Sequence, residues 1–259
     1  MKVAAIQFAG IPATPEANRQ KAAALINEAA DKGARLLVLP EYWPAGFNPL
    51  QVPDFAETMR DATVSLLRRL AKERQVFIVS GSLAEKRDGR LYNTTAAISE
   101  TGEIAAKYRK THLCPLKEEE IFFPGDEWTI TEYSGLRVGI ISCYDVYFPE
   151  FTRNLALRGA QLLAMPAMVE KTAEEVRLLT RARALENSCF VIMANQALNA
   201  AAGLSLIISP DGRVLAEAGS KDEVLLAELD MHSLASVRGE RNILNNRRNI
   251  LDEIDNSQL

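Results

Sequence analysis

The sequence predicts a layered α/β fold with mixed sheets, in a single domain over residues 1–259. Short apolar runs alternate with stretches of helical periodicity along the chain, which is typical of layered α/β proteins. Some of these runs are separated by helices, as in parallel sheets, whereas others are joined by tight turns, as in hairpins. No linker-like, repeated or low-complexity segment divides the chain. We therefore expect one continuous domain.

The first third alternates strand and helix. Val3–Phe8 is a short apolar run. Thr14-Pro15-Glu16 then opens a helix, because a threonine cap followed by proline favours a helix start, and Lys32-Gly33 ends it. The nearly continuous apolar run Arg35–Leu39 predicts a strand covered on both faces. The next helix and strand are expected at about Phe55–Arg74 and at Val76–Ser80.

Two hairpins and a second alternating segment follow. The hairpins pair Asn93–Ser99 with Glu103–Tyr108 and Trp128–Tyr133 with Leu136–Ser142, each around a glycine-containing turn. The alternating helices and strands are expected at about Pro149–Arg158, Gln161–Met165, Ala173–Asn187 and Phe190–Ala194. The last strands are Gly203–Ser209, Arg213–Ala216 and Glu223–Leu229, before a polar, Arg/Asn-rich tail from Met231.

The composition argues against several classes of protein. The 30 Lys and Arg against 34 Asp and Glu give a net charge of −4, whereas nucleic-acid-binding proteins usually carry a basic excess. Three cysteines are too few, and odd in number, for a disulfide framework, so we expect a cytoplasmic protein. No apolar run fits a signal peptide or a membrane helix, so neither nucleic acid nor membrane is an expected partner.

Cys143 is the candidate nucleophile by position. It follows the predicted strand Leu136–Ser142 and precedes Pro149-Glu150, which resemble the first turn of a helix. Ligands of α/β proteins bind at such carboxyl ends of strands. The alternative is a small apolar core residue, which is the interpretation we favour for Cys189, while Cys114 is placed in a loop or at a strand end.

A catalytic cysteine needs a proton acceptor, and histidine is scarce. His232 resembles a solvated helix start, and His112 is expected to orient its loop through a ring hydrogen bond rather than to catalyse. A glutamate becomes the leading candidate, because burial can raise its pKa toward neutrality. Glu41 directly follows a predicted strand and has aromatic neighbours, although a surface acid is an equal alternative. Lys110 ends another strand, and by spacing alone it is a solvated lysine.

A family resemblance favours the catalytic interpretation of Glu41, Lys110 and Cys143. Pro40-Glu41, Tyr108–Leu113 and Cys143-Tyr144-Asp145, in this order, resemble the three signature blocks of the nitrilase superfamily of carbon–nitrogen hydrolases. The similarity extends to further short segments and covers essentially the whole chain. These segments are Val3–Gln7, Pro124-Gly125-Asp126, Phe148-Pro149-Glu150, Arg158-Gly159-Ala160, Pro166-Ala167 and Arg183–Asn187.

The resemblance implies a catalytic triad. Glu41 would be the general base, Lys110 the cationic stabiliser and Cys143 the nucleophile. The family also has a second glutamate after the lysine, and here Glu118, Glu119 and Glu120 compete for that position. The number of residues between this position and Pro124-Gly125-Asp126 favours Glu118.

The resemblance also implies a fold and an assembly. The fold is a four-layer αββα sandwich, and two such units pair into a homodimer or a higher homo-oligomer. The tail, about residues 231–259, contains the segment Arg238–Asn249. This segment either crosses the partner subunit or is solvated.

The expected reaction is hydrolysis of a small aliphatic amide through a cysteine thioester, with Lys110 and the backbone N–H of Tyr144 stabilising the oxyanion. Neither a metal nor another cofactor is expected. Nitrile hydrolysis and N-carbamoyl cleavage are alternatives with the same triad, and a non-catalytic binding module is a further one. Aromatic and methionine side chains near the signature blocks either line an apolar pocket or belong to the core. They are Tyr42, Trp43, Phe47, Tyr144, Tyr147, Met165 and Met168.

Overall fold

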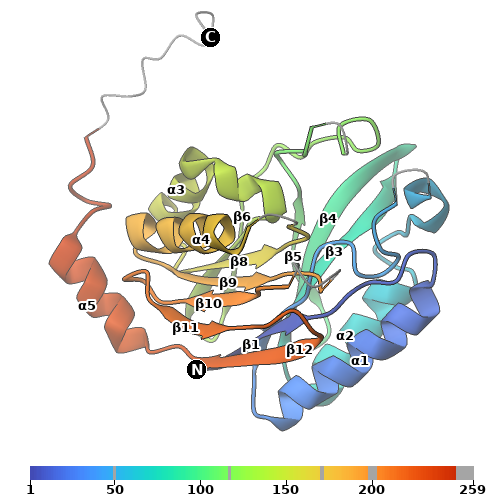
Figure 1. Ribbon diagram of the computed structural model, residues 1–259, viewed down its shortest axis with the longest axis horizontal. Helices are drawn as coiled ribbons and strands as arrows, with labels where there is room; N and C mark the ends of the chain where they lie inside the picture. Colours follow the sequence, from blue (N-terminus) through green and yellow to red (C-terminus); the bar gives the residue numbers. More distant parts are fainter. Residues whose placement is uncertain (49–50, 116–117, 170–171, 198–202, 249–259) are drawn as a thin grey trace, which may run out of the picture.

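Two six-stranded sheets form the centre of the protein (Figure 1). The computed structural model describes residues 1–48, 51–115, 118–169, 172–197 and 203–248. The first sheet has the order β12-β1-β2-β3-β4-β5 and the second β11-β10-β9-β8-β7-β6. The strands of the first sheet are β1 Lys2–Gln7, β2 Leu36–Val38, β3 Phe77–Arg87, β4 Arg90–Ile98, β5 Ile104–Arg109 and β12 Glu223–Glu228. Those of the second are β6 Thr129–Tyr133, β7 Leu136–Ile140, β8 Leu162–Pro166, β9 Phe190–Ala194, β10 Leu206–Ile208 and β11 Val214–Glu217.

Both sheets are mixed, as the sequence predicts. Strands β1, β2 and β3 pair in parallel, and so do β7, β8 and β9, because helical crossovers connect them. The remaining pairs are antiparallel.

Helices cover the outer faces of the two sheets (Figure 1). Helices α1 Pro15–Asp31 and α2 Ala62–Arg74 pack on the first sheet, and α3 Pro149–Leu157 and α4 Ala173–Asn187 lie on the second. The result is the expected αββα sandwich. Two short 3-10 turns, η1 Val52–Phe55 and η2 Cys143–Tyr147, and the helix α5 Met231–Arg241 complete the described elements.

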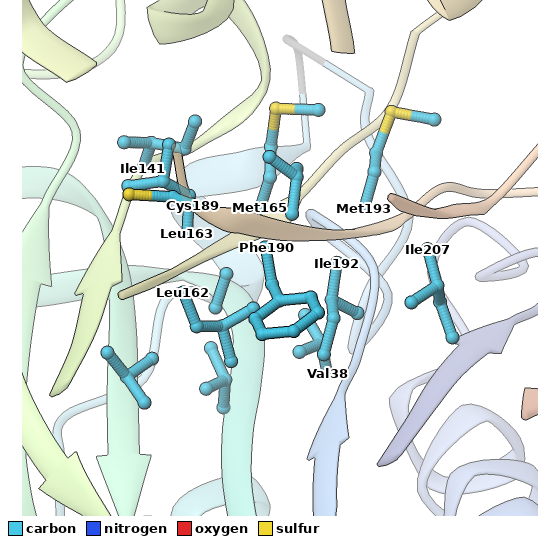
Figure 2. Packing of buried hydrophobic residues seen from close by; sticks show 14 of the residues in the cluster. Val38, Ile141, Leu162, Leu163, Met165, Cys189, Phe190, Ile192, Met193 and Ile207 are labelled. Carbon is cyan, nitrogen blue, oxygen red and sulfur yellow. The ribbon is translucent and has the colours of Figure 1, made fainter. Parts of the chain in front are cut away.

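Buried apolar side chains fill the space between the two sheets, and a second cluster lies between the first sheet and helices α1 and α2. Every residue of β8 and β9 is buried, which explains why their sequences are continuously apolar. Figure 2 shows Phe190 and Ile192 of β9 pointing toward the other sheet, where Val38 lies, while Met193 points away from it. This alternation fills both faces of the sheet with side chains.

The helix predicted at Phe55–Arg74 begins later, at Ala62. The segment before it is not helical at Glu57, because the backbone of this residue pairs with β3: its N–H donates to Ala84 at 2.9 Å and its carbonyl accepts from Lys86 at 2.8 Å. Strand β3 itself continues past Ser80 to Arg87, since it turns directly into β4. Thr14 precedes α1 but makes no side-chain cap, because its hydroxyl donates to the carbonyl of Ile11.

The polar tail contains a helix that periodicity did not reveal. Asp230 caps α5 by accepting the N–H of His232 at 2.9 Å. Arg238 then donates to the backbone carbonyls of Ser188 at 3.0 Å and Ala160 at 2.5 Å. This arginine therefore binds its own chain. Residues 249–259 of the tail lie outside the described residues.

Candidate active site

Glu41, Lys110 and Cys143 follow the strands β2, β5 and β7, and the sandwich brings these three strand ends together. The ammonium Nζ of Lys110 lies 2.8 Å from Oε1 of Glu41, and both side chains are buried. Cys143 is partly exposed. The hydroxyl of Ser142, directly before it, donates to Oε1 of Glu41 at 3.1 Å, and Glu41 and Lys110 both act on the pKa of the Cys143 thiol, so the three groups share one site.

Glu118 is the glutamate that reaches Lys110. Its Oε1 and Oε2 lie 3.0 and 2.8 Å from the lysine Nζ. The hydroxyl of Tyr42 donates to Oε1, and the backbone N–H of Cys114 donates to Oε2 at 2.7 Å. Its neighbours in the sequence, Glu119 and Glu120, are exposed. Of the three acids, Glu118 is therefore the one that contacts Lys110.

Two polar residues of the site were not expected from the sequence. The amide Nδ2 of Asn93 donates to Oε1 of both Glu41 and Glu118, at 2.9 Å each. The hydroxyl of Ser142 donates to Oε1 of Glu41 at 3.1 Å. Asn93 is the first residue of the strand predicted at Asn93–Ser99, and it lies inside β4. Asparagine is unfavourable in strands, and this is the signal that could have revealed it.

A close backbone approach positions Glu41. Gly81, at a register shift in β3, has φ +70°, and a Cβ there would lie 2.1 Å from the carbonyl oxygen of Pro40. Only glycine fits this contact without displacing the loop. The backbone N–H of Glu41 donates to Ala167 at 3.2 Å, and its carbonyl accepts from Nε2 of Gln196 at 2.5 Å. The loop of the carboxylate is therefore tied to both sheets.

Lys110 is held in a similar way. Gly125 donates its N–H to the carbonyl of Lys110 at 2.9 Å. A Cβ on Gly125 would lie 2.2 Å from the carbonyl oxygen of Arg109, so the segment that follows β5 is packed against glycine backbone. This contact gives a physical reason for the Pro124-Gly125-Asp126 segment noted in the sequence.

Cys143 occupies a strained turn. Its φ is +44°, in the left-handed region that non-glycine residues rarely adopt, and it begins the turn η2. Buried Asp145 stabilises this turn by accepting the N–H of Ser142 at 2.7 Å and the hydroxyl of Tyr108 at 2.6 Å. The ring Nδ1 of His112 lies 2.8 Å from the same carboxylate, which is the orienting hydrogen bond expected of this histidine.

The pKa values of the two carboxylates, Glu41 and Glu118, are shifted in opposite directions. Burial raises the pKa of Glu41 above its ordinary value, so this group takes up a proton readily. Burial also opposes the ionisation of Glu118, but Lys110, Tyr42 and the Cys114 N–H outweigh it and lower the pKa of Glu118. The site thus contains one carboxylate suited to accept a proton and one suited to remain charged.

The two remaining titratable groups of the site are the lysine and the thiol. Burial alone would lower the pKa of Lys110, yet the anionic groups around it raise that pKa well above its ordinary value. Burial and the Glu41 carboxylate raise the pKa of the Cys143 thiol well above its usual range. The cysteine therefore rests as a thiol and needs a base, whereas the lysine stays protonated.

The expected pocket residues divide between the site and the core. The hydroxyl of Tyr42 donates to Glu118. Half-buried Met168 packs against the cluster that contains Tyr42. A hydrogen bond from the Met168 backbone lowers the pKa of Cys143. Trp43, which was a candidate for the pocket, lies in the core instead. Its ring lies 5.7 Å from that of Phe8 in the core between the first sheet and its helices, and its Nε1 donates to a carbonyl of β3 at 2.7 Å.

Tyr42, the residue before Trp43, has φ +55°, in the left-handed region. Of the other candidates, Phe47 packs against the ring of Tyr42 and Met165 is buried in the core. Tyr144 and Tyr147 are half-buried beside Cys143.

Neither a metal cluster nor a membrane helix occurs in the part of the chain that the structure describes. No group of three His, Cys, Asp or Glu side chains there has an arrangement that could hold a metal ion. No helix over the same residues is long and apolar enough to cross a bilayer.

Comparison with known proteins gives a consistent result. The model of the carbon-nitrogen hydrolase family matches residues 2–239. Omega-amidase NIT2-A of Xenopus laevis is 35% identical over 269 residues, covering 98% of this chain and 97% of that protein. The 2-oxoglutaramate amidase of Bacillus subtilis (strain 168) is 36% identical over 242 residues, which cover 91% and 93% of the two chains.

Solved structures agree with the sequence relatives. Nit3 of Saccharomyces cerevisiae, described as a member of branch 10 of the nitrilase superfamily, superposes with a TM-score of 0.90 at 30% identity over 96% of both chains. A structure of the amidase from Nesterenkonia sp. AN1 has a TM-score of 0.85 at 29% identity, over 96% of this chain and 94% of that one. That structure shows covalent addition of the acetamide moiety of fluoroacetamide at the active-site cysteine.

Proposed function

The chain belongs to the carbon–nitrogen hydrolase family, and from this premise we propose that Glu41, Lys110, Glu118 and Cys143 are its catalytic residues. The protein is an amidase that hydrolyses the C–N bond of a small linear amide to the acid and ammonia. The convergence of a buried carboxylate, a buried ammonium and a partly exposed thiol carries the assignment of roles. The contacts of Lys110 with Glu41 and Glu118 support this assignment.

In the first step, Glu41 accepts the proton of the Cys143 thiol while the sulfur attacks the amide carbon. The raised pKa of Glu41 suits this transfer, because a base is most effective when its pKa approaches the working pH. The raised pKa of the thiol makes such a base necessary. The product is a tetrahedral intermediate whose oxygen carries a negative charge.

The oxyanion is stabilised by Lys110 and by the N–H of Tyr144. An ammonium has three N–H donors, and Nζ of Lys110 contacts Oε1 of Glu41 and both carboxylate oxygens of Glu118. The substrate oxygen would take the place of one of the two Glu118 oxygens, which leaves each glutamate with one bond to the lysine. Glu118 stays ionised and holds the ammonium in place, so the charge is preorganised where the reaction develops it.

Collapse of the intermediate completes the reaction. Protonated Glu41 returns its proton to the departing nitrogen, the C–N bond breaks, and ammonia leaves a thioester on Cys143. A water molecule then gives one proton to Glu41 and its hydroxyl to the thioester carbon. The C–S bond breaks, the acid is released, and the thiol regains its proton from Glu41.

Trapping of the thioester tests this function. We expect the protein to release ammonia from short aliphatic amides and, with hydroxylamine present, to form the corresponding hydroxamates. Cys143→Ala should abolish both products, whereas Cys189→Ala, which removes a buried thiol away from the site, should retain them. Full activity of the Cys143→Ala variant, or no product from any short amide, would contradict the proposal. Nitriles and N-carbamoyl compounds in the same panel test the alternative substrates.

We also propose that the protein forms a homodimer and works in the cytoplasm. Large apolar side chains on α3 and α4 support an interface, since Leu157, Leu178 and Leu185 are 41%, 66% and 42% exposed. Analytical ultracentrifugation should find a dimer that Leu178→Lys weakens and Leu215→Lys, on β11, does not. A monomer at micromolar concentration would contradict this. Three free cysteines support a reducing compartment, which fractionation of expressing cells would test.

A further inference from the structure

The carboxylate of Glu118 receives more hydrogen bonds than it has lone-pair sites. Oε1 is contacted by Nζ of Lys110 at 3.0 Å, by Nδ2 of Asn93 at 2.9 Å and by the hydroxyl of Tyr42. Oε2 is contacted by Nζ of Lys110 at 2.8 Å and by the backbone N–H of Cys114 at 2.7 Å. A carboxylate offers about four lone-pair sites, two on each oxygen. Oε1 therefore has one donor more than it needs.

The donor that Oε1 can lose most easily is Lys110. The three N–H groups of this ammonium are shared among Oε1 of Glu41 at 2.8 Å, Oε2 of Glu118 at 2.8 Å and Oε1 of Glu118 at 3.0 Å. The last of these contacts is the longest, and it lies on the oxygen with a surplus of donors. Its replacement by another acceptor therefore costs the site the least.

A substrate oxygen that takes this N–H leaves both oxygens of Glu118 satisfied. Oε1 keeps the donors of Tyr42 and Asn93, and Oε2 keeps Lys110 and the N–H of Cys114. If the substrate oxygen replaced Oε2 instead, that oxygen would keep a single donor, and an unsatisfied buried acceptor is costly. The arrangement of donors thus favours Oε1 as the oxygen that gives up Lys110.

Tyr42 is well suited to remain on Oε1 when Lys110 leaves it. The residue is 3% exposed, and its ring centroid lies 4.7 Å from that of Phe47 and 5.8 Å from that of Phe122. Burial and the carboxylates of Glu118 and Glu41 raise the pKa of its hydroxyl well above the ordinary value. The phenol therefore stays protonated and keeps donating to Glu118.

Asn93 does not make Tyr42 redundant. Its amide donates both to Oε1 of Glu41 and to Oε1 of Glu118, so it serves the two carboxylates at once. The single proton of the Tyr42 hydroxyl goes to Glu118. Without this hydroxyl, Oε1 needs Lys110 as its second donor, and the substrate oxygen has to compete with Glu118 for the same N–H.

We infer that Tyr42 is a positioning residue: its hydroxyl satisfies Oε1 of Glu118 and so releases one N–H of Lys110 to the substrate oxygen. The inference rests on the amidase reaction proposed above and adds the residue that makes the lysine donor available. In the free enzyme the hydroxyl contributes little, because Lys110, Asn93 and Cys114 already satisfy the carboxylate. Its contribution is largest when the oxyanion forms.

Tyr42→Phe tests this inference, because it removes the hydroxyl and retains the ring. The substrate is the amide, from acetamide to pentanamide, from which the wild type releases ammonia fastest. We expect kcat and kcat/KM to fall equally, by about 10- to 100-fold, the range for a hydrogen bond to a charged group. KM should stay within about threefold, since the interaction is made in the transition state.

Two comparisons accompany the kinetics. The melting temperature of Tyr42→Phe should stay close to that of the wild type, because the free enzyme depends little on the hydroxyl. Tyr133→Phe is the matched control. It removes the hydroxyl of a tyrosine at the end of β6, whose ring packs on Phe77 with centroids 5.0 Å apart. This variant should keep the kinetic constants of the wild type.

A double-mutant cycle shows whether Tyr42 acts through the lysine. In Lys110→Met no ammonium is left to release, so the addition of Tyr42→Phe should lower the remaining rate by less than about threefold. The full 10- to 100-fold loss in this background would mean that Tyr42 acts by another route, and it would overturn the inference.

The remaining outcomes separate the inference from the activity. An unchanged kcat in Tyr42→Phe, while the wild type releases ammonia, overturns the role of Tyr42 and leaves the amidase function intact. No ammonia release by the wild type from any of these amides overturns both. If circular dichroism shows that Tyr42→Phe is unfolded, Tyr42→Met, which also lacks the hydroxyl, takes its place in both measurements.

Discussion

The ammonium of Lys110 lies 2.8 Å from Oε1 of Glu41, and neither side chain is more than 2% exposed. A pair so deeply buried is costly to desolvate, and its stability depends on further hydrogen bonds. Here Glu118, Asn93 and Ser142 provide them. The pair is therefore one part of a network whose members should respond differently to substitution.

Lys110→Met should lower kcat/KM for a short amide by at least about 10²-fold, because the oxyanion loses its full positive charge. Ammonia release measures this. Lys107→Met is the matched control: Lys107 lies on β5 three residues earlier and pairs with Glu85, which retains Arg109 as a partner. The control should keep most of its activity. Unchanged kinetics in Lys110→Met would assign this lysine a purely structural role.

Glu41→Gln should reduce turnover by at least about 10²-fold while the melting temperature changes little, because the proton acceptor is lost but Lys110 keeps Glu118 as a partner. Steady-state kinetics and thermal unfolding together check this. Glu120→Gln, an exposed acid, should behave as wild type. A Glu41→Gln variant with a near-normal rate would refute the base assignment.

Asn93→Leu should move the acidic limb of the kcat/KM profile to higher pH. The base is active when ionised, so the rate rises as the pH passes the pKa of Glu41. The hydrogen bond from Asn93 lowers that pKa, and its loss raises it further. The matched control is Thr95→Val on the same strand, where the hydroxyl has no partner among the described residues. A rate loss in Asn93→Leu without a shifted limb would show that Asn93 does not position the base.

Acid should destabilise the protein below about pH 4.3, the ordinary glutamate pKa. The folded state lowers the pKa of Glu118, so it binds fewer protons than the unfolded state. The stabilisation is present above the ordinary pKa and is lost as the pH falls through the lowered one. Melting temperatures between pH 7 and pH 3 should fall less steeply for Glu118→Gln than for wild type. Glu119→Gln, which is exposed, should follow the wild-type curve.

Gly81→Ala should destabilise the protein by about 2–4 kcal/mol and impair turnover, since a methyl group would collide with the carbonyl of Pro40. Gly89→Ala is the matched control. Gly89 also has a left-handed φ, +75°, but a Cβ there meets no atom within 4 Å. It should cost about 1–2 kcal/mol, the backbone strain alone, and leave activity intact. If chemical denaturation shows the same loss of unfolding free energy in both variants, the close contact between Gly81 and the Glu41 loop does not determine the stability of the protein.

Most of the regular structure could be predicted from the sequence. Ala173–Asn187 and Phe190–Ala194 have the predicted bounds, because helical periodicity and a continuous apolar run are local signals. The start of α2 was misplaced, since the segment at Glu57 is held by backbone bonds to β3. The start of helix α5 was indicated at His232, but its extent was not predicted, because its sequence is largely polar and Leu234 is its one buried residue.

By itself, the sequence determined that Glu41, Lys110 and Cys143 follow strands, because strand ends are visible in the order of apolar and polar residues. Only the tertiary structure decided which groups meet them. Glu118 rather than Glu119 reaches Lys110, and Asn93 bridges two carboxylates that are 77 residues apart in the chain. Such contacts depend on how two sheets and their loops pack. The spacing to Pro124-Gly125-Asp126 favoured Glu118, but it could not show that this side chain reaches Lys110.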